Sequence, residues 1–165
     1  MNSSRPANNR VEPGPGQESV WDYPRPPRVE RLKQRVTIDV GGLRVVDTSD
    51  VVRVLETSHP PVYYLPRSSF APGVLRPSPG RTYCEFKGEA HYLSVGGKAG
   101  AAWFYPAPTI GYEELTDRVA VYPSAVELCT VDGETVTAQE GDFYGGWITS
   151  KIVGPFKGAA GTWGW

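Results

Sequence analysis

Cysteine is scarce in this chain: the two cysteines, Cys84 and Cys129, lie far apart, and no Cys-x-x-Cys pair occurs. A zinc site built from four thiolates is therefore excluded, and we expect no metal. Two isolated thiols suit a reducing compartment better than a secreted disulfide scaffold. Because the N-terminus also lacks the apolar segment of a signal peptide, the sequence indicates a cytoplasmic protein.

Long apolar runs and an excess of one charge are missing as well. No run approaches the roughly 18 residues of a membrane span, so we expect no membrane partner. The formal net charge is only -1, which argues against a nucleic-acid partner. The sequence has no phosphate-binding glycine loop, no dinucleotide-binding glycine pattern and no cluster of metal-binding carboxylates, so we expect no cofactor.

Glycine and proline, in contrast, are abundant, with 19 and 16 residues in a chain of 165. They separate short β-like runs, and no segment keeps a helical period for about ten residues. Alternating apolar residues on both sides of Gly41-Gly42 predict a hairpin. Residues 67–75 favour one helical turn, residues 77–80 a break and residues 96–100 a loop. The further strands that we expect cover residues 51–56, 62–65, 82–86, 91–95, 119–122, 126–131 and 134–138. This pattern predicts one all-β domain, a sandwich or an open barrel with little helix.

Three regions are expected along the chain. Residues 1–19 are polar and rich in Asn, Ser, Pro and Gly, which is typical of a disordered leader. Residues 20–140 form the all-β domain. Residues 141–165 alternate glycine with aromatic residues such as Trp147 and Trp163, and a disordered tail seldom carries so many aromatics. We therefore predict an ordered extension that packs on its own domain or on a partner subunit, and the second arrangement would make a homodimer.

One aromatic motif, Trp-x-Tyr-Pro-x-Pro, occurs at residues 21–26 and again at residues 103–108. Proline fixes φ and has no backbone N–H, so these prolines hold the preceding aromatic residues on a rigid elbow. An aromatic side chain held in this way suits the wall of a cavity. A second motif, Phe-Lys-Gly-x-Ala, occurs at residues 86–90 and 156–160. The shared order of the two motifs leaves both an internal duplication and a coincidence open.

Glu56 and Lys87 are the ionisable residues with the most informative settings. Glu56 ends an apolar run, and a carboxylate buried there without a partner would cost several kcal/mol. A buried Glu56 therefore needs a cation, and Lys87, Arg67 and Arg76 are the candidates. Lys87 falls at a bend released by Gly88, where its ammonium group could point into a cleft. A strand-end Glu56 in solvent and a solvated Lys87 are the structural alternatives.

The thiols and imidazoles give less support to covalent catalysis. Cys84 is better explained as a small buried hydrophobic residue than as a nucleophile. His59 stands in a turn before two prolines and is interpreted as structural. His91 begins a strand, where its side chain has the opposite parity to Cys84. A Cys–His pair is therefore disfavoured, and no nucleophile elbow for a Ser-His-Asp triad is present.

Taken together, the motifs resemble the domain of unknown function 427 family. The residues that carry the resemblance are Trp21 to Glu30, Leu55-Glu56-Thr57, Tyr63-Tyr64-Leu65-Pro66, Thr82 to Gly88, Trp103 to Pro108 and Val131-Asp132-Gly133-Glu134. One departure is Glu85, which stands where a proline is common in that family. The matching residues span about 20–138, so the resemblance says little about the tail.

The resemblance implies an all-β fold of the β-tent group, which includes the ligand-binding domain of cereblon and methionine sulfoxide reductase B. Those relatives often hold zinc on a Cys-x-x-Cys motif that this chain lacks, so zinc and the reductase chemistry are not expected here. The naming of the family suggests nucleotidyltransferase activity, but no phosphate-binding loop or paired metal-binding carboxylates in the sequence support it. The fold we expect is a single β-tent-like antiparallel sheet domain with an extended Gly/aromatic tail.

The leading functional hypothesis is a pocket for a small polar ligand. Tyr64, Trp103 and Tyr105 would form its walls, while Glu56 and Lys87 would orient the ligand, since pockets commonly place a few polar groups among apolar ones. Two alternatives stay open. An enzyme would use Glu56 as general acid or base and Lys87 as electrostatic stabiliser. An interaction protein would use the aromatic tail as its binding element.

Overall fold

The protein is all-β in the computed structural model, which describes residues 9–141 and 143–165. Within those residues the only helical segments are four 3-10 turns of three residues each, namely η2 (Val20–Asp22), η3 (Arg67–Ser69), η4 (Glu113–Leu115) and η5 (Pro123–Ala125). No helix in the described part of the chain has the length and apolar character needed to cross a membrane. The all-β prediction is therefore confirmed.

The larger sheet has seven strands, and every neighbouring pair in it is antiparallel. In spatial order its strands are β2 (Arg28–Leu32), β5 (Val51–Leu55), β6 (Val62–Pro66), β10 (Arg118–Val121), β9 (Lys98–Phe104), β8 (Gly88–Val95) and β7 (Leu75–Cys84). Every residue of β5 and β10 is buried, because both faces of the sheet are covered at these strands. This explains why β5 carries apolar residues on both of its faces, with Arg53 as its one charged residue.

Two local predictions on this sheet were wrong. Residues 77–80 do not break the chain but lie within β7, with a register shift between Ser78 and Arg81. An edge strand tolerates Pro77 and Pro79 because it can face the missing N–H groups away from its neighbour. Residues 96–100 are not a loop throughout: the turn is Gly96-Gly97, and β9 begins at Lys98.

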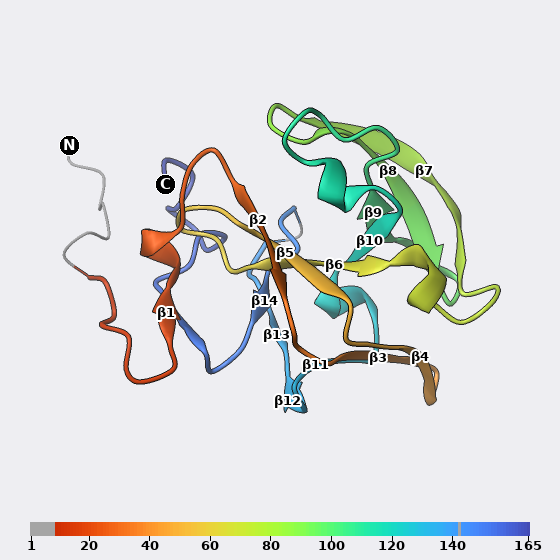
Figure 1. The fold of residues 1–165 in the computed structure, drawn as a ribbon, viewed down its shortest axis with the longest axis horizontal. Helices are drawn as coiled ribbons and strands as arrows, with labels where there is room; N and C mark the ends of the chain where they lie inside the picture. The colour runs from red at the N-terminus through yellow and green to blue at the C-terminus, as the bar shows by residue number, and fades with distance from the viewer. Residues whose placement is uncertain (1–8, 142) are drawn as a thin grey trace.

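The smaller sheet has four strands and lies at the lower edge of the view in Figure 1. Its spatial order is β12 (Glu134–Thr135), β11 (Leu128–Val131), β3 (Val36–Val40) and β4 (Leu43–Thr48). β3 and β4 form the hairpin predicted at Gly41-Gly42. Both glycines have positive φ, 59° and 79°, as a two-residue hairpin turn of this hand requires. Most of the antiparallel strands thus belong to these two sheets.

The core follows the two-residue period of the strands. On β6, Tyr63 and Leu65 pack into the main core with residues of the smaller sheet, including Ile38 and Val46. Tyr64 points to the opposite face, where it joins an aromatic cluster with Trp103 and Tyr105. Because successive side chains of a strand face opposite sides, the same sheet carries an aliphatic core on one face and an aromatic cluster on the other.

The two ends of the chain pack against this body and against each other. β1 (Glu18–Ser19) pairs in parallel with β15 (Ile152–Val153), and β13 (Thr137–Ala138) pairs with β14 (Trp147–Ile148). Residues 1–8 of the expected leader lie outside the described residues, whereas β1, at the end of that leader, is hydrogen-bonded into the fold. β1 and the C-terminal end lie on the same side of the molecule (Figure 1).

The C-terminal extension, residues 141–165, inserts one side chain into the main core. Trp147 is 1% exposed and stacks on Tyr63 with ring centroids 4.9 Å apart. Its indole N–H donates to the carbonyl of Val121 at 3.1 Å. Trp163, in contrast, is 81% exposed. The extension therefore packs on its own domain through Trp147, while its last turn leaves a large aromatic side chain in solvent.

Candidate functional site

A cleft of about 320 Å³ opens over the aromatic face of the larger sheet. Its lining includes all five residues named from the sequence: Glu56, Tyr64, Lys87, Trp103 and Tyr105. They come from the ends of β5 and β9, from β6 and from the bend between β7 and β8. These segments meet because β6, β10 and β9 are neighbours in the sheet and the β7–β8 hairpin continues it. The structure thus brings together side chains that are up to about fifty positions apart in sequence.

The wall of the cleft is a set of interlocked aromatic rings. Trp103 meets Tyr64 edge-on at 6.3 Å and packs on Tyr122 at 4.6 Å, and its indole N–H donates to the Tyr64 hydroxyl at 3.4 Å. Tyr64 and Tyr105 lie 6.2 Å apart. Burial raises the pKa values of Tyr64 and Tyr105 well above that of a free phenol. The wall therefore presents neutral phenols that can donate hydrogen bonds.

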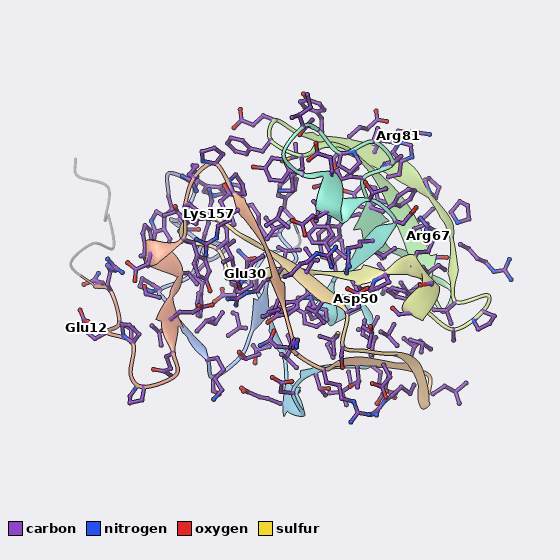
Figure 2. The ribbon with its side chains drawn as sticks, viewed as in Figure 1. Glu12, Glu30, Asp50, Arg67, Arg81 and Lys157 are labelled. Carbon is purple, nitrogen blue, oxygen red and sulfur yellow. The ribbon has the colours of Figure 1, made fainter. Side chains whose placement is uncertain are left out.

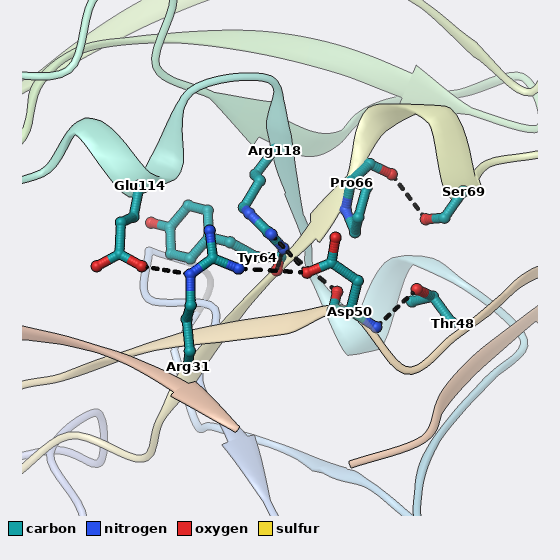
Figure 3. A network of polar contacts seen from close by, with 8 residues as sticks. All are labelled: Arg31, Thr48, Asp50, Tyr64, Pro66, Ser69, Glu114 and Arg118. Carbon is teal, nitrogen blue, oxygen red and sulfur yellow. Dashed lines mark hydrogen bonds and ion pairs between the residues drawn. The ribbon is translucent and has the colours of Figure 1, made fainter. Parts of the chain in front are cut away.

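Tyr64 is also fixed from behind, through its backbone. Arg118 is only 7% exposed, and its guanidinium donates to the carbonyl of Tyr64 at 3.3 Å and to the carboxylate of Asp50 at 2.6 Å. Figure 3 shows this network continuing through Asp50 to Arg31 and Glu114. This buried arginine therefore restrains the backbone of Tyr64, which forms part of the cleft wall.

Glu56 has a cationic partner, but not one of those expected from the sequence. Its carboxylate lies 3.3 Å from the guanidinium of Arg25, and its side chain is 24% exposed. The expectation of Lys87, Arg67 or Arg76 was wrong. Arg25 belongs to the first Trp-x-Tyr-Pro-x-Pro segment, which leads into β2 and so lies beside the end of β5. Arg67 instead lies over the Phe104 ring at 4.5 Å.

Lys87 sits at the bend that its sequence predicted. Gly88 has a φ of 110°, and a Cβ there would lie 3.3 Å from the carbonyl oxygen of Ala107. The half-buried Lys87 side chain places its ammonium nitrogen 5.9 Å from the centre of the Tyr105 ring. Among the described residues this ammonium group has no ion pair. Within the described part of the chain, it is therefore a cation at the cleft wall whose N–H groups can donate to a ligand.

His59 was interpreted as a structural turn residue, and the structure adds a second role. It is 9% exposed and lines the cleft. Its Nδ1 is 2.9 Å from the carbonyl oxygen of Thr57, so Nδ1 carries the proton and Nε2 is an acceptor. Burial lowers the pKa of His59, although the carboxylate of Glu56 opposes this shift. The cleft therefore contains a neutral imidazole.

Several lining residues come from the C-terminal extension and were not found from the sequence. They are Phe143, Tyr144, Gly145 and Lys157, preceded by Gln139 at the end of the domain. Gly145 closes tightly on the wall, because a Cβ there would lie 2.3 Å from Cη2 of Trp103. The sequence signals for this placement were the aromatic content of the tail and the second Phe-Lys-Gly-x-Ala motif, whose Lys157 lines the cleft as Lys87 of the first motif does. Figure 2 shows Lys157 on the side of the molecule opposite to Arg67 and Arg81.

The two cysteines have different environments. Cys129 is buried in the main core, and burial raises the pKa of its thiol to about 12. Cys84 is half-buried, lines the cleft and packs on the aromatic cluster. His91 is engaged elsewhere, with Nε2 at 2.7 Å from Glu89. Among the described residues no group of three His, Cys, Asp or Glu side chains is arranged to hold a metal ion.

A comparison with protein families matches residues 28–132 to the model described as Domain of unknown function (DUF427). The chain belongs to this family. No curated protein matches the sequence. The DUF427 match contains Glu56, Tyr64, Lys87, Trp103 and Tyr105 but ends before Gln139 and the extension. The cleft of this DUF427 protein is thus built from the family domain and completed by residues beyond the matched region.

Proposed function

We propose that this DUF427 protein binds a small polar ligand in the cleft. The observation that carries the proposal is the convergence of Tyr64, Trp103 and Tyr105 with Glu56 and Lys87 on one cavity of about 320 Å³. Small-molecule sites of about 300–1,000 Å³ commonly combine aromatic walls with a few polar groups that fix orientation. The two free thiols also support a location in the reducing cytoplasm.

The cleft offers complementary chemistry to such a ligand. The rings of Trp103 and Tyr122 pack at 4.6 Å with a tilt of 48°, and either ring can contact a planar group of a ligand. Glu56 and the Nε2 atom of His59 accept hydrogen bonds, whereas Lys87 donates them. This combination suits a molecule with a flat apolar part and polar substituents on its edge.

Catalysis is the second candidate, and the position of Glu56 beside a neutral His59 favours it. In that case Glu56 would act as general acid or base and Lys87 would stabilise developing negative charge. The two candidates differ in one measurable property. Glu56→Gln would abolish turnover of a bound ligand while leaving its binding within a few fold if Glu56 is catalytic, and would weaken binding itself if Glu56 only orients the ligand.

A thermal-shift screen of the whole chain against small metabolites tests the proposal. A ligand at about 100 times its Kd stabilises the folded state by about 2.7 kcal/mol, which raises the Tm of a chain of this length by roughly 5–10 °C. The hit should lose this effect in Glu56→Gln but keep it in Arg44→Met, which breaks an ion pair on β4 outside the cleft. A screen without hits, or hits that Glu56→Gln and Trp103→Phe leave unchanged, would refute the proposal.

A further inference from the structure

We infer that the cleft receives an anionic ligand, a carboxylate or phosphate carried on a planar ring, and that Lys87 and Lys157 are the two cations that bind its charged group. This inference rests on the proposed function and makes its ligand class specific. It also assigns a binding residue, Lys157, to a part of the chain that the DUF427 match does not cover.

Among the described residues that line the cleft, the carboxylates and the amines balance in number but differ in their partners. Its carboxylates are Glu56 and Glu85, and its amines are Lys87 and Lys157. Arg25 already neutralises Glu56 at 3.3 Å, and Glu85 is exposed to solvent. Both lysines are half-buried, where their charges are screened less than at the open surface. A ligand with a negative group would balance the two lysines.

The two ammonium groups are held in matching ways on the wall. Lys87 Nζ lies 5.9 Å from the centre of the Tyr105 ring, and Lys157 Nζ lies 5.6 Å from the centre of the Tyr144 ring. A ring face attracts an ammonium group without using up its N–H donors. The ammonium group of Lys157 donates one hydrogen bond, to the backbone oxygen of Trp165 at 3.1 Å. Its remaining donors, and those of Lys87, can bind the oxygens of an anion.

The backbone of Lys157 is fixed beside the polar end of the cleft. Its N–H donates to the carbonyl of Ser58 at 2.8 Å, and its carbonyl accepts from the side-chain amide of Gln139 at 2.7 Å. Ser58 precedes His59, and the charge of Lys157 helps to lower the pKa of His59. Lys157 and His59 also share a neighbour, because the Lys157 ammonium lies 5.6 Å and the His59 ring 5.0 Å from the centre of the Tyr144 ring. Its position is set by the fold rather than by a freely moving tail.

The flat part of the ligand would contact the aromatic residues of the same cleft. Its aromatic face includes the rings of Trp103 and Tyr122, which are tilted by 48° to each other, and Gly145 lies directly against Trp103 because no side chain would fit there. A planar ring on this face and an acidic group toward the lysines would satisfy both halves of the cleft. The extension contributes to both parts of the cleft, with Gly145 against the aromatic residue Trp103 and Lys157 as one of the two cations.

Matched pairs of charged and neutral ring compounds test the inference by calorimetric titration of the full chain. The probes are nicotinate with nicotinamide, and phenyl phosphate with phenol. At least one anion should bind about tenfold or more tightly than its neutral partner, and its affinity should fall with added salt. Preference for nicotinate would identify a carboxylate ligand, and preference for phenyl phosphate would identify a phosphate ligand.

Variants then assign the charge selectivity to residues. Lys87→Met and Lys157→Met should each weaken the preferred anion by about tenfold, whereas Lys151→Met, in the exposed turn before β15, should not. Lys157→Arg should retain binding and serves as the folded reference if Lys157→Met is unstable. Equal affinity for charged and neutral partners, or a salt-independent affinity, would overturn the inference and leave the proposed function standing. Failure of all four probes at about 10 mM would also overturn it, while neutral hits in the metabolite screen would still support a ligand site.

Discussion

At the scale of single residues, His59 couples the cleft to pH. Its imidazole is buried edge-on to Tyr144 at 5.0 Å, and burial lowers its pKa below the ordinary value of 6.5. The folded protein therefore resists protonation of His59 where the unfolded chain accepts it. As pH falls below about 6.5, the unfolded state binds the extra proton first, so the free energy of unfolding decreases. The loss continues until pH reaches the lowered pKa of the folded state.

His59→Asn should remove this part of the acid sensitivity. The asparagine amide can still donate to the carbonyl of Thr57, but it cannot titrate. Wild type should lose at most about 1.4 kcal/mol of stability per pH unit below 6.5 through His59, and the variant should lack this contribution. Urea titrations at pH 7.5, 6.5 and 5.5 measure the difference. His91→Asn is the control, and a wild-type pH slope retained in His59→Asn would contradict the prediction.

At the scale of elements, Trp147 is the side chain by which the C-terminal extension enters the main core. Trp147 stacks on Tyr63 and donates to the carbonyl of Val121 within the main core. Trp147→Ala would leave a cavity and an unpaired carbonyl, at a cost of about 3–5 kcal/mol. We expect a fall in Tm of roughly 6–20 °C. Trp163→Ala, which removes the exposed indole, should stay within about 0.5 kcal/mol of wild type. Equal melting temperatures for the two variants would contradict this role of Trp147.

Sequence patterns of a few residues predicted those strands whose formation depends on nearby residues alone. The β3–β4 hairpin follows from alternation around two glycines, and β5 follows from an apolar run. The proline-containing stretch in β7 was read as a break because sequence does not say whether a strand lies at an edge. Edge position depends on which strands pair, and that is decided by the whole sheet.

The residues of the candidate site also fall into a group that the sequence predicted and a group that it did not. The family motifs predicted all five site residues, three in the wall and two that orient the ligand. They could do so because each motif lies on or beside a strand of one sheet. Arg25, the partner of Glu56, and Lys157, which lines the cleft, were missed because they belong to the N-terminal segment and to the extension, far in sequence from the strands of the wall. No periodicity links them to β5 or β9. Only packing of the chain ends against the larger sheet brings them there.

At the scale of the whole molecule, one arginine connects the N-terminal segment to the larger sheet. Arg53 on β5 is 8% exposed, and its guanidinium pairs with Glu18 of β1 at 2.7 Å and with Glu30 of β2 at 2.6 Å. Tyr23 adds a hydrogen bond from its hydroxyl to Glu18 at 2.8 Å. β1 in turn pairs with β15 of the extension. The N-terminal segment, and through β1 the extension that lines the cleft, are thus held partly by this cluster.

Arg53→Met should therefore destabilise the protein more than the loss of an ordinary surface ion pair. The substitution keeps an apolar stem in place but leaves two partly buried carboxylates facing each other without a cation, which we expect to cost roughly 2–4 kcal/mol. The matched control is Arg44→Met, whose side chain is 48% exposed where that of Arg53 is 9% exposed, and whose loss should cost less than about 1 kcal/mol. Thermal unfolding should separate the two variants by at least about 4 °C.

Lowering the pH to protonate the carboxylates, or adding Glu18→Gln to Arg53→Met, should recover part of the loss because the uncompensated charge is then reduced. If Arg53→Met melts with Arg44→Met, or if removal of the Glu18 charge gives no recovery, the cluster does not hold the N-terminal segment in the way described.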